Sequence, residues 1–134
     1  MNITSIDHVV LTVKDVSESV NFYESVLGMT AEIFDTDRVA LTFGNQKINL
    51  HTHGKEFEPK ADKPTPGAAD LCFITETQLD LAMEHVRNNG INILQGPGTR
   101  TGAIGKLISF YFRDPDRNLI EVANHAIEKE ETYI

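Results

Sequence analysis

Along the chain, the spacing of hydrophobic residues changes from that of a strand to that of a helix, and this change occurs twice. The repetition predicts two copies of one structural unit. Residues 6–13 are rich in β-branched side chains and predict a strand. Residues 16–27 then place apolar side chains at helical spacing. Residues 69–75 predict a second strand, and residues 79–86 again show helical spacing. We therefore expect each of these strands to lead into an amphipathic helix.

Capping residues predict the ends of both helices. Asp15, with Glu18 three positions later, forms a capping-box pattern at the start of the first helix. Gly28 suits the left-handed residue that commonly follows the last turn of a helix. The same three roles recur at one constant offset of 62 residues, at Thr77, Asp80 and Gly90. This shared register indicates an internal repeat.

Short apolar segments separated by turn residues follow each helix. They predict strands near 30–35, 38–43, 46–53, 91–95, 107–113 and 118–124. The Gly-rich stretch between residues 96 and 105 predicts a mobile loop at the mouth of a cavity. The expected fold is therefore α+β, with two tandem βαβββ modules forming a curved, partly open mixed sheet around a cavity.

We expect one domain over residues 1–134. Module one covers about 4–53, and module two covers about 67–125. The intervening linker, 54–66, contains three prolines and shows no apolar periodicity. Residues 126–134 are rich in glutamate and predict a solvated acidic tail.

Composition and charge narrow the possible functions. The 134 residues carry a net charge of −8 with a pI near 5.0, which disfavours nucleic acid and anionic membrane surfaces as partners. No apolar run reaches the ~18 residues of a membrane-spanning helix. The single cysteine, Cys72, excludes an internal disulfide and a Cys-rich zinc site, and we expect it to be a cavity-wall residue. The first residues lack a signal-peptide pattern, so we expect a cytoplasmic protein.

Alternation along the strands predicts where polar side chains gather. Val9, Leu11 and Val13 are uniformly apolar and should meet the helix, so His8 should point into the concave face. The same alternation selects one polar position on each of three further strands, namely Asn49 or His51, Asp70, and Glu121.

Two inward carboxylates are costly to bury without a compensating positive charge. No Lys or Arg lies at a matching position on these strands, so a divalent cation is expected to compensate them. Imidazole and carboxylate ligands suit Fe, Mn, Ni, Zn or Co, and the pattern leaves the identity open.

Three segments, IDHVVLTV, FYESVLG and FRDPDRNLIEV, resemble the vicinal oxygen chelate (VOC) superfamily. This superfamily includes glyoxalase I, fosfomycin resistance enzymes, extradiol dioxygenases and bleomycin-binding proteins. The resemblance covers about residues 4–125, and its most specific part is the closing motif over residues 114–121. The chain looks most similar to small glyoxalase-domain and virulence-type members. Arg117 stands where the family usually has Gly in the turn.

The resemblance implies a set of metal ligands. The family's first-strand histidine falls on His8 and its last-strand glutamate on Glu121. Asp70 stands where the family usually has His. Asn49 stands where glyoxalase I has Glu, and His51, two residues on, could substitute for it. These two departures argue against the chemistry of glyoxalase I itself and leave a site of His8, Asp70 and Glu121 with a fourth ligand undecided.

The resemblance also implies a function. The metal of VOC enzymes chelates two neighbouring oxygens of a small substrate and stabilises the anion that forms. We therefore expect a glyoxalase-like lyase or isomerase, or a dioxygenase, with Glu121 as ligand and catalytic base. Asn49, Arg100 and Tyr111 are candidate substrate contacts, and many relatives are homodimers.

Two alternatives remain open at this stage. A metal-free small-molecule binding protein of the bleomycin-resistance kind would hold a flat or cationic ligand in the cavity. An interaction module would instead have a cavity filled by side chains, although the small side chains of Val10 and Cys72 disfavour that.

Overall fold

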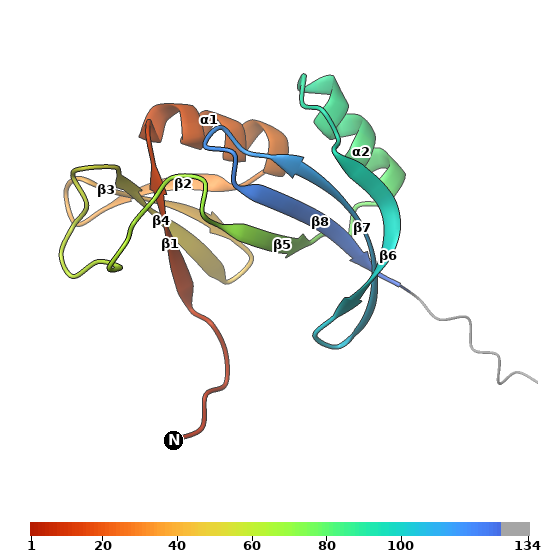
Figure 1. Ribbon diagram of the computed structural model, residues 1–134, viewed down its shortest axis with the longest axis horizontal. Helices are drawn as coiled ribbons and strands as arrows, with labels where there is room; N and C mark the ends of the chain where they lie inside the picture. The colour runs from red at the N-terminus through yellow and green to blue at the C-terminus, as the bar shows by residue number, and fades with distance from the viewer. Residues whose placement is uncertain (127–134) are drawn as a thin grey trace, which may run out of the picture. The chain divides into compact units, whose positions relative to one another are not determined.

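The structure, a computed structural model, describes residues 1–126 of the chain. It divides into two compact units, each containing one βαβββ module (Figure 1). The first unit comprises residues 1–69 together with the turn at 114–118, and the second comprises residues 70–113 and, within the described residues, 119–126. The predicted acidic tail lies, from residue 127 on, outside the described residues.

The elements of the two units follow the same order. The first unit contains β1 (His8–Val13), α1 (Val16–Leu27), β2 (Thr30–Phe34), β3 (Arg38–Phe43) and β4 (Gln46–Thr52). The second contains β5 (Asp70–Ile74), α2 (Leu79–Asn88), β6 (Gln95–Gly102), β7 (Gly105–Arg113) and β8 (Leu119–His125). The sheet orders are β1-β4-β3-β2 and β5-β8-β7-β6. In each sheet the first pair is parallel and the other pairs are antiparallel, which confirms the predicted repeat and the α+β fold class.

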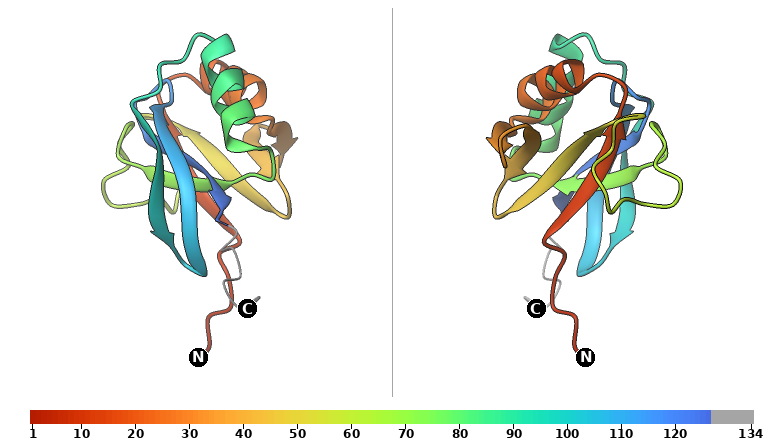
Figure 2. Two further views of the ribbon diagram at one scale, coloured as in Figure 1. Left: turned by 90° about the vertical axis from the view of Figure 1, so that its right-hand side faces the viewer. Right: turned by 90° about the vertical axis from the view of Figure 1, so that its left-hand side faces the viewer.

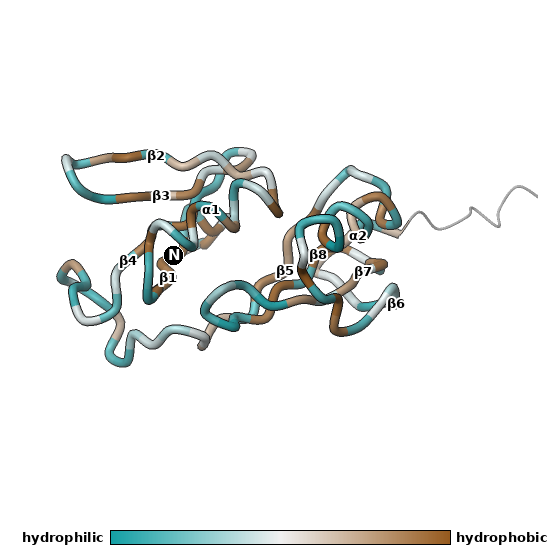
Figure 3. The backbone as a smooth tube through the Cα atoms, turned by 90° about the horizontal axis from the view of Figure 1, so that it is seen from above, coloured by the Kyte–Doolittle hydropathy of each residue, from teal (hydrophilic) through white to brown (hydrophobic). Residues whose placement is uncertain are grey.

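In each unit the helix covers one face of the sheet (Figure 2), and the buried side chains on that face are apolar. In the first unit, Leu11, Leu41 and Ile48 are 5%, 0% and 1% exposed and form the core beneath α1. In the second, Phe110 and Ile120 are fully buried in the corresponding positions. In Figure 3 the hydrophobic stretches follow the strands and helices, whereas the segment after β4 is mostly hydrophilic. Burial of these apolar faces stabilises each module.

The predicted caps of α1 are confirmed. The Asp15 side chain accepts a hydrogen bond from the Glu18 amide at 3.1 Å, and Gly28 ends the helix in the left-handed region at φ +67°. The predicted cap of α2 is wrong by one residue, because the helix begins at Leu79 after Gln78 without a side-chain cap. Thr77 is held in the preceding loop, where its carbonyl accepts from Asn124 Nδ2 at 2.9 Å.

The prediction of a strand near 91–95 and a loop over 96–105 is also wrong. The Gly-rich stretch forms most of β6, which is the edge strand of its sheet and pairs with β7. A register shift between Gln95 and Gly98 accommodates Pro97, as edge strands and bulges allow. A Cβ at Gly96 would come 2.7 Å from the Phe110 Cα, so only glycine permits this approach of the two backbones.

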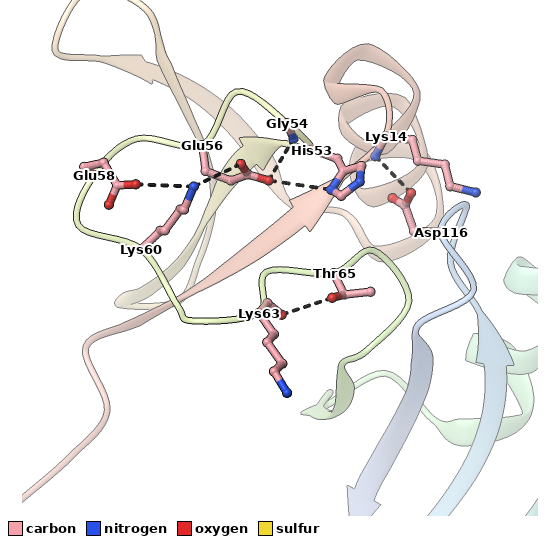
Figure 4. Close-up of polar contacts among 9 residues, drawn as sticks. All are labelled: Lys14, His53, Gly54, Glu56, Glu58, Lys60, Lys63, Thr65 and Asp116. Carbon is pink, nitrogen blue, oxygen red and sulfur yellow. Dashed lines mark hydrogen bonds and ion pairs between the residues drawn. The ribbon is translucent and has the colours of Figure 1, made fainter.

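The linker after β4 contains no helix or strand between residues 53 and 69, as predicted. Glu56 organises its beginning (Figure 4): the Gly54 amide donates to Glu56 Oε2 at 2.9 Å, and Lys60 Nζ lies 3.8 Å from Oε1. The Gly54 hydrogen bond is the largest cause that lowers the pKa of the Glu56 carboxyl. None of the described helices is long and apolar enough to span a membrane.

The turn between β7 and β8 is packed against α1 by buried polar groups. The Tyr23 hydroxyl donates to Asp114 Oδ2 at 2.7 Å. The Lys14 amide donates to Asp116 Oδ1 at 3.0 Å, and the Ala69 amide donates to Asn118 Oδ1 at 2.8 Å. The closing motif that carries the family resemblance therefore has a structural role in the first unit.

Arg117, in the same turn, adopts φ +70°, which explains why glycine suits this position. We expect Arg117→Gly to raise the free energy of unfolding by about 0.5–1 kcal/mol, because the left-handed region costs an L-residue more than the extra freedom of unfolded glycine. Urea denaturation measures this change. Arg117→Ala keeps the Cβ and should give no such gain; an equal gain in both variants would assign the effect to the side chain and contradict the backbone explanation.

Candidate functional site

The open face of the first sheet carries the polar residues that the strand alternation predicted. The parallel register of β1 and β4 pairs Val10 with Asn49 and Thr12 with His51. His8 shares this face because it lies two residues before Val10. All of these side chains lie on the face opposite α1, as expected.

His8 is oriented by its neighbour in the sequence. Its Nδ1 lies 2.8 Å from Asp7 Oδ1. The carboxylate can only accept, so we assign a proton to Nδ1; in the neutral imidazole the lone pair then lies on Nε2. The His8 side chain is 44% exposed, so an external ligand can approach it. This contact favours the neutral tautomer that binds a metal through Nε2.

Asn49 lies at the centre of the open face and is buried, with 5% of its surface exposed. Among the described residues, no group donates a hydrogen bond to its Oδ1. An unpaired buried carbonyl oxygen costs about 1–3 kcal/mol. The position therefore favours a donor or a cation that approaches Asn49 from outside the chain.

His51 is surrounded differently. Arg38 Nη2 lies 3.3 Å from His51 Nε2, and the Phe57 ring packs edge-on against the imidazole with centroids 5.5 Å apart. The pKa of His51 is lowered, first by burial and then by the Arg38 charge. The neutral imidazole thus accepts from Arg38 through Nε2, which occupies the nitrogen that would otherwise face a ligand.

The first unit also contains a cavity of about 620 Å³ beside β1. Thr12 and His51 form part of its wall, and Asn118 of the β7–β8 turn contributes to it. Linker residues that include Lys60, Lys63 and Thr65, labelled in Figure 4, also line it. This volume suits a small molecule.

The open face of the second sheet carries the other candidate residues. The register pairs Cys72 of β5 with Glu121 of β8, and Glu121 with Tyr111 of β7. Ser109 lies two residues before Tyr111 on β7 and therefore shares this face. Asp70, at the start of β5, is exposed and lies on the same face two residues before Cys72.

Hydrogen bonds from both neighbouring strands hold the Glu121 carboxylate. Ser109 Oγ donates to Glu121 Oε2 at 2.6 Å, and the Cys72 thiol also hydrogen-bonds to the carboxylate. Burial, followed by the charge of Glu121, raises the pKa of Cys72 to about 11. The thiol therefore stays protonated at neutral pH, consistent with a cavity-wall residue and not a nucleophile.

The predicted ligands are divided between the units, with His8 and His51 in the first and Asp70 and Glu121 in the second. Within residues 1–126, no three His, Cys, Asp or Glu side chains form a group that could hold a metal ion. The individual donors nevertheless suit a divalent cation. Nε2 of His8 is free to coordinate while Nδ1 contacts a carboxylate, and Glu121 retains unused lone pairs.

Three partners of the candidate residues were not predicted from the sequence: Asp7, Arg38 and Ser109. Asp7 had a usable signal, because a carboxylate adjacent to a candidate metal histidine can orient its imidazole. Ser109 had a signal too, since a five-residue connection between β7 and β8 places it beside Glu121 on one face. Arg38 had none, because its contact depends on the side-chain conformation of a long residue on another strand.

The sequence profile of the Glyoxalase/Bleomycin resistance protein/Dioxygenase superfamily matches residues 5–122. Virulence protein STM3117 of Salmonella typhimurium is 54% identical over 125 residues, which cover 93% of this chain and 87% of that protein. Its crystal structure superposes with a TM-score of 0.93, covering 94% of this chain and all of the other.

Two further relatives cover most of this chain. The glyoxalase domain-containing protein RDO1 of Mycosarcoma maydis is 47% identical over 93% of this chain and 70% of its own length. The metallothiol transferase FosB of Staphylococcus epidermidis is 27% identical over 99% of this chain and 90% of its own length. With the repeated βαβββ module and a profile match over most of its length, the chain belongs to the Glyoxalase/Bleomycin resistance protein/Dioxygenase superfamily.

Proposed function

We propose that this protein is a metal-dependent VOC enzyme that acts on a small molecule through bidentate oxygen chelation. His8, Asp70 and Glu121 are the proposed protein ligands of one divalent cation. The reaction is a glyoxalase-like lyase or isomerase reaction, or a dioxygenase reaction. A cytoplasmic homodimer remains part of the proposal.

The observation that carries this proposal is the hydrogen bond between His8 Nδ1 and Asp7 Oδ1. A carboxylate on one imidazole nitrogen raises the basicity of the other and fixes the ring orientation, which is the usual arrangement of a metal-binding histidine. The contacts of Glu121 with Ser109 and Cys72 give the second donor a comparable support. The name of FosB, a metallothiol transferase, agrees with metal chemistry within the family.

The fourth ligand is proposed to be Asn49 in preference to His51. The Asn49 Oδ1 atom is buried without a donor among residues 1–126, whereas Arg38 contacts His51 Nε2. A neutral amide oxygen is a weaker ligand than a carboxylate, so it leaves more positive charge on the cation.

The bound cation would supply Lewis acidity toward neighbouring substrate oxygens. The remaining steps fall to the chain. Glu121 accepts a substrate proton, and the Ser109 hydroxyl holds one oxygen of the carboxylate so that the other faces the substrate. The neutral Cys72 thiol adds no charge beside this base.

Metal analysis and titration test the proposal. Protein purified without chelators should contain a divalent ion, and the apoprotein should bind Mn²⁺, Fe²⁺, Co²⁺, Ni²⁺ or Zn²⁺ with a Kd below about 1 μM. Turnover of hemithioacetal and catechol substrates, measured with and without EDTA, separates the isomerase from the dioxygenase reaction. Absence of metal binding at this affinity, combined with a ligand-induced thermal shift that persists in EDTA, would replace the proposal with a metal-free binding protein.

A further inference from the structure

The second unit contains a cavity of about 470 Å³, bordered by the β6–β7 hairpin and the open face of its sheet. The polar side chains in its wall are those of Arg100, Tyr111, Glu121, Cys72, Thr101 and His125. Ile104 and Leu107 contribute apolar surface. A volume of this size, with a few polar groups on an apolar wall, is typical of a small-molecule site.

Arg100 is held in place by two hydrogen bonds and a ring contact. Its Nε donates to the Tyr111 hydroxyl oxygen at 3.1 Å, and its Nη1 donates to the Thr99 carbonyl at 2.9 Å. Its guanidinium carbon lies 5.4 Å from the centroid of the Tyr111 ring. Among the described residues, no carboxylate forms an ion pair with it. Three of its five N–H donors therefore have no protein acceptor there.

Gly98 makes room for this guanidinium. A Cβ at Gly98 would lie 3.1 Å from Arg100 Nη1, closer than nearly all such contacts. The backbone of Gly98 does not have a positive φ, so its conformation does not require glycine. The absence of a side chain at Gly98 thus leaves space for the Arg100 guanidinium, which lies on the same face of β6.

Tyr111 completes a pair of donors. Because its oxygen accepts from Arg100 Nε, its own proton is free to be donated. A planar guanidinium with unused N–H groups beside a phenol is suited to a carboxylate or a phosphonate. The Glu121 carboxylate lines the same cavity but forms no ion pair with Arg100, so among the described residues the positive charge of Arg100 remains available to an external anion.

We propose that Arg100 and Tyr111 bind an oxyanion group of the substrate, either a carboxylate or a phosphonate, in this cavity. The substrate class is then a small molecule that bears an anionic group in addition to its chelating oxygens. That the bound anion belongs to a substrate rests on the proposed function, whereas the anion site lies entirely within the second unit and needs no metal.

Binding of methylphosphonate and of acetate to the metal-free protein in EDTA tests this inference, measured by calorimetry and by the NMR signal of the Arg100 Nε–H group. We expect saturable binding of at least one probe with a Kd below about 20 mM, and a shift of that signal. Comparing the two probes identifies which oxyanion is preferred. Arg100→Gln should weaken binding by about tenfold or more, since it removes the charge-assisted donors.

Two variants separate a positioned guanidinium from a general charge effect. Gly98→Ala keeps the charge but displaces Nη1, and it should weaken binding by about threefold. Arg87→Gln removes the same charge from α2 and should leave binding unchanged. Equal binding by wild type and Arg100→Gln, or no binding of either probe, would overturn the inference. Because EDTA is present throughout, a failure of the protein to bind metal would not change the anion-binding result. A failure to bind the anion would likewise leave the proposed metal site untouched.

Discussion

Replacing Glu121 with glutamine should lower the affinity of the protein for a divalent cation by about 100-fold or more, because a charged ligand becomes a neutral amide. The Ser109 hydroxyl still has an oxygen to contact in this variant, so the surrounding structure is retained. Competition calorimetry with Co²⁺ or Zn²⁺ measures the affinity, and the Co²⁺ absorption spectrum reports the coordination. The effect is expected to be the largest at any position in the second unit.

The same experiment separates ligands from their supports. His8→Gln should match the loss at Glu121, whereas Asp7→Asn should lose about tenfold, because the amide holds the imidazole less firmly. Glu84→Gln removes the same charge as Glu121→Gln from an exposed position on α2 and should leave the affinity unchanged. If Glu121→Gln and Glu84→Gln bind metal equally well, Glu121 is not a ligand.

The repeated fold could be predicted from the sequence because its signals are local. A capping aspartate, a left-handed glycine and a change from strand to helix period each depend on a few neighbouring residues, and α1 shows all three as expected. The β6 strand could not be predicted in this way, because Gly96 and Pro97 are typical of loops. These residues suit a strand here because β6 lies at the edge of its sheet and because Gly96 approaches the backbone of Phe110. Both features depend on the tertiary structure and not on the local sequence.

The candidate site could be predicted only as far as strand alternation reaches. The alternation correctly assigned His8 and Glu121 to the open faces, since period two is a property of one strand. It could not show that Arg38 contacts His51, because the two residues lie 13 positions apart on different strands. That long-range contact occupies His51 Nε2 and leaves Asn49 as the residue that is available to a ligand.

The closing motif over residues 114–121 contributes both to the candidate site and to the stability of the first unit. Its residues identified the family through Glu121, yet Asp114, Asp116 and Asn118 are buried in hydrogen bonds of the first unit. Tyr23 lies on the buried face of α1. A fully buried tyrosine needs a partner for its hydroxyl, and the Asp114 carboxylate of this turn provides it.

We accordingly predict that Tyr23→Phe lowers the free energy of unfolding by about 2–3 kcal/mol, the loss expected for a buried hydrogen bond to a charged group. Tyr23 is 0% exposed, and its hydroxyl donates to Asp114 Oδ2 at 2.7 Å. The Asn118 side chain and two amides still donate to this carboxylate, so the buried charge is not left entirely unpaired. Urea denaturation followed by circular dichroism measures the change.

A double-mutant cycle with Asp114→Asn assigns the effect to this hydrogen bond. Both single variants should destabilise the protein, and the combined variant should lose less than their sum, because the second substitution removes a partner that is already lost. Ser19→Ala is the matched control, since its hydroxyl lies 3.5 Å from Asp116 Oδ2 and should contribute less than about 1 kcal/mol. Additive losses in the cycle would show that the Tyr23 hydroxyl is not coupled to Asp114 and would contradict this assignment. A coupling of the expected size would instead establish that the family's closing turn is held to the first module by a charged hydrogen bond.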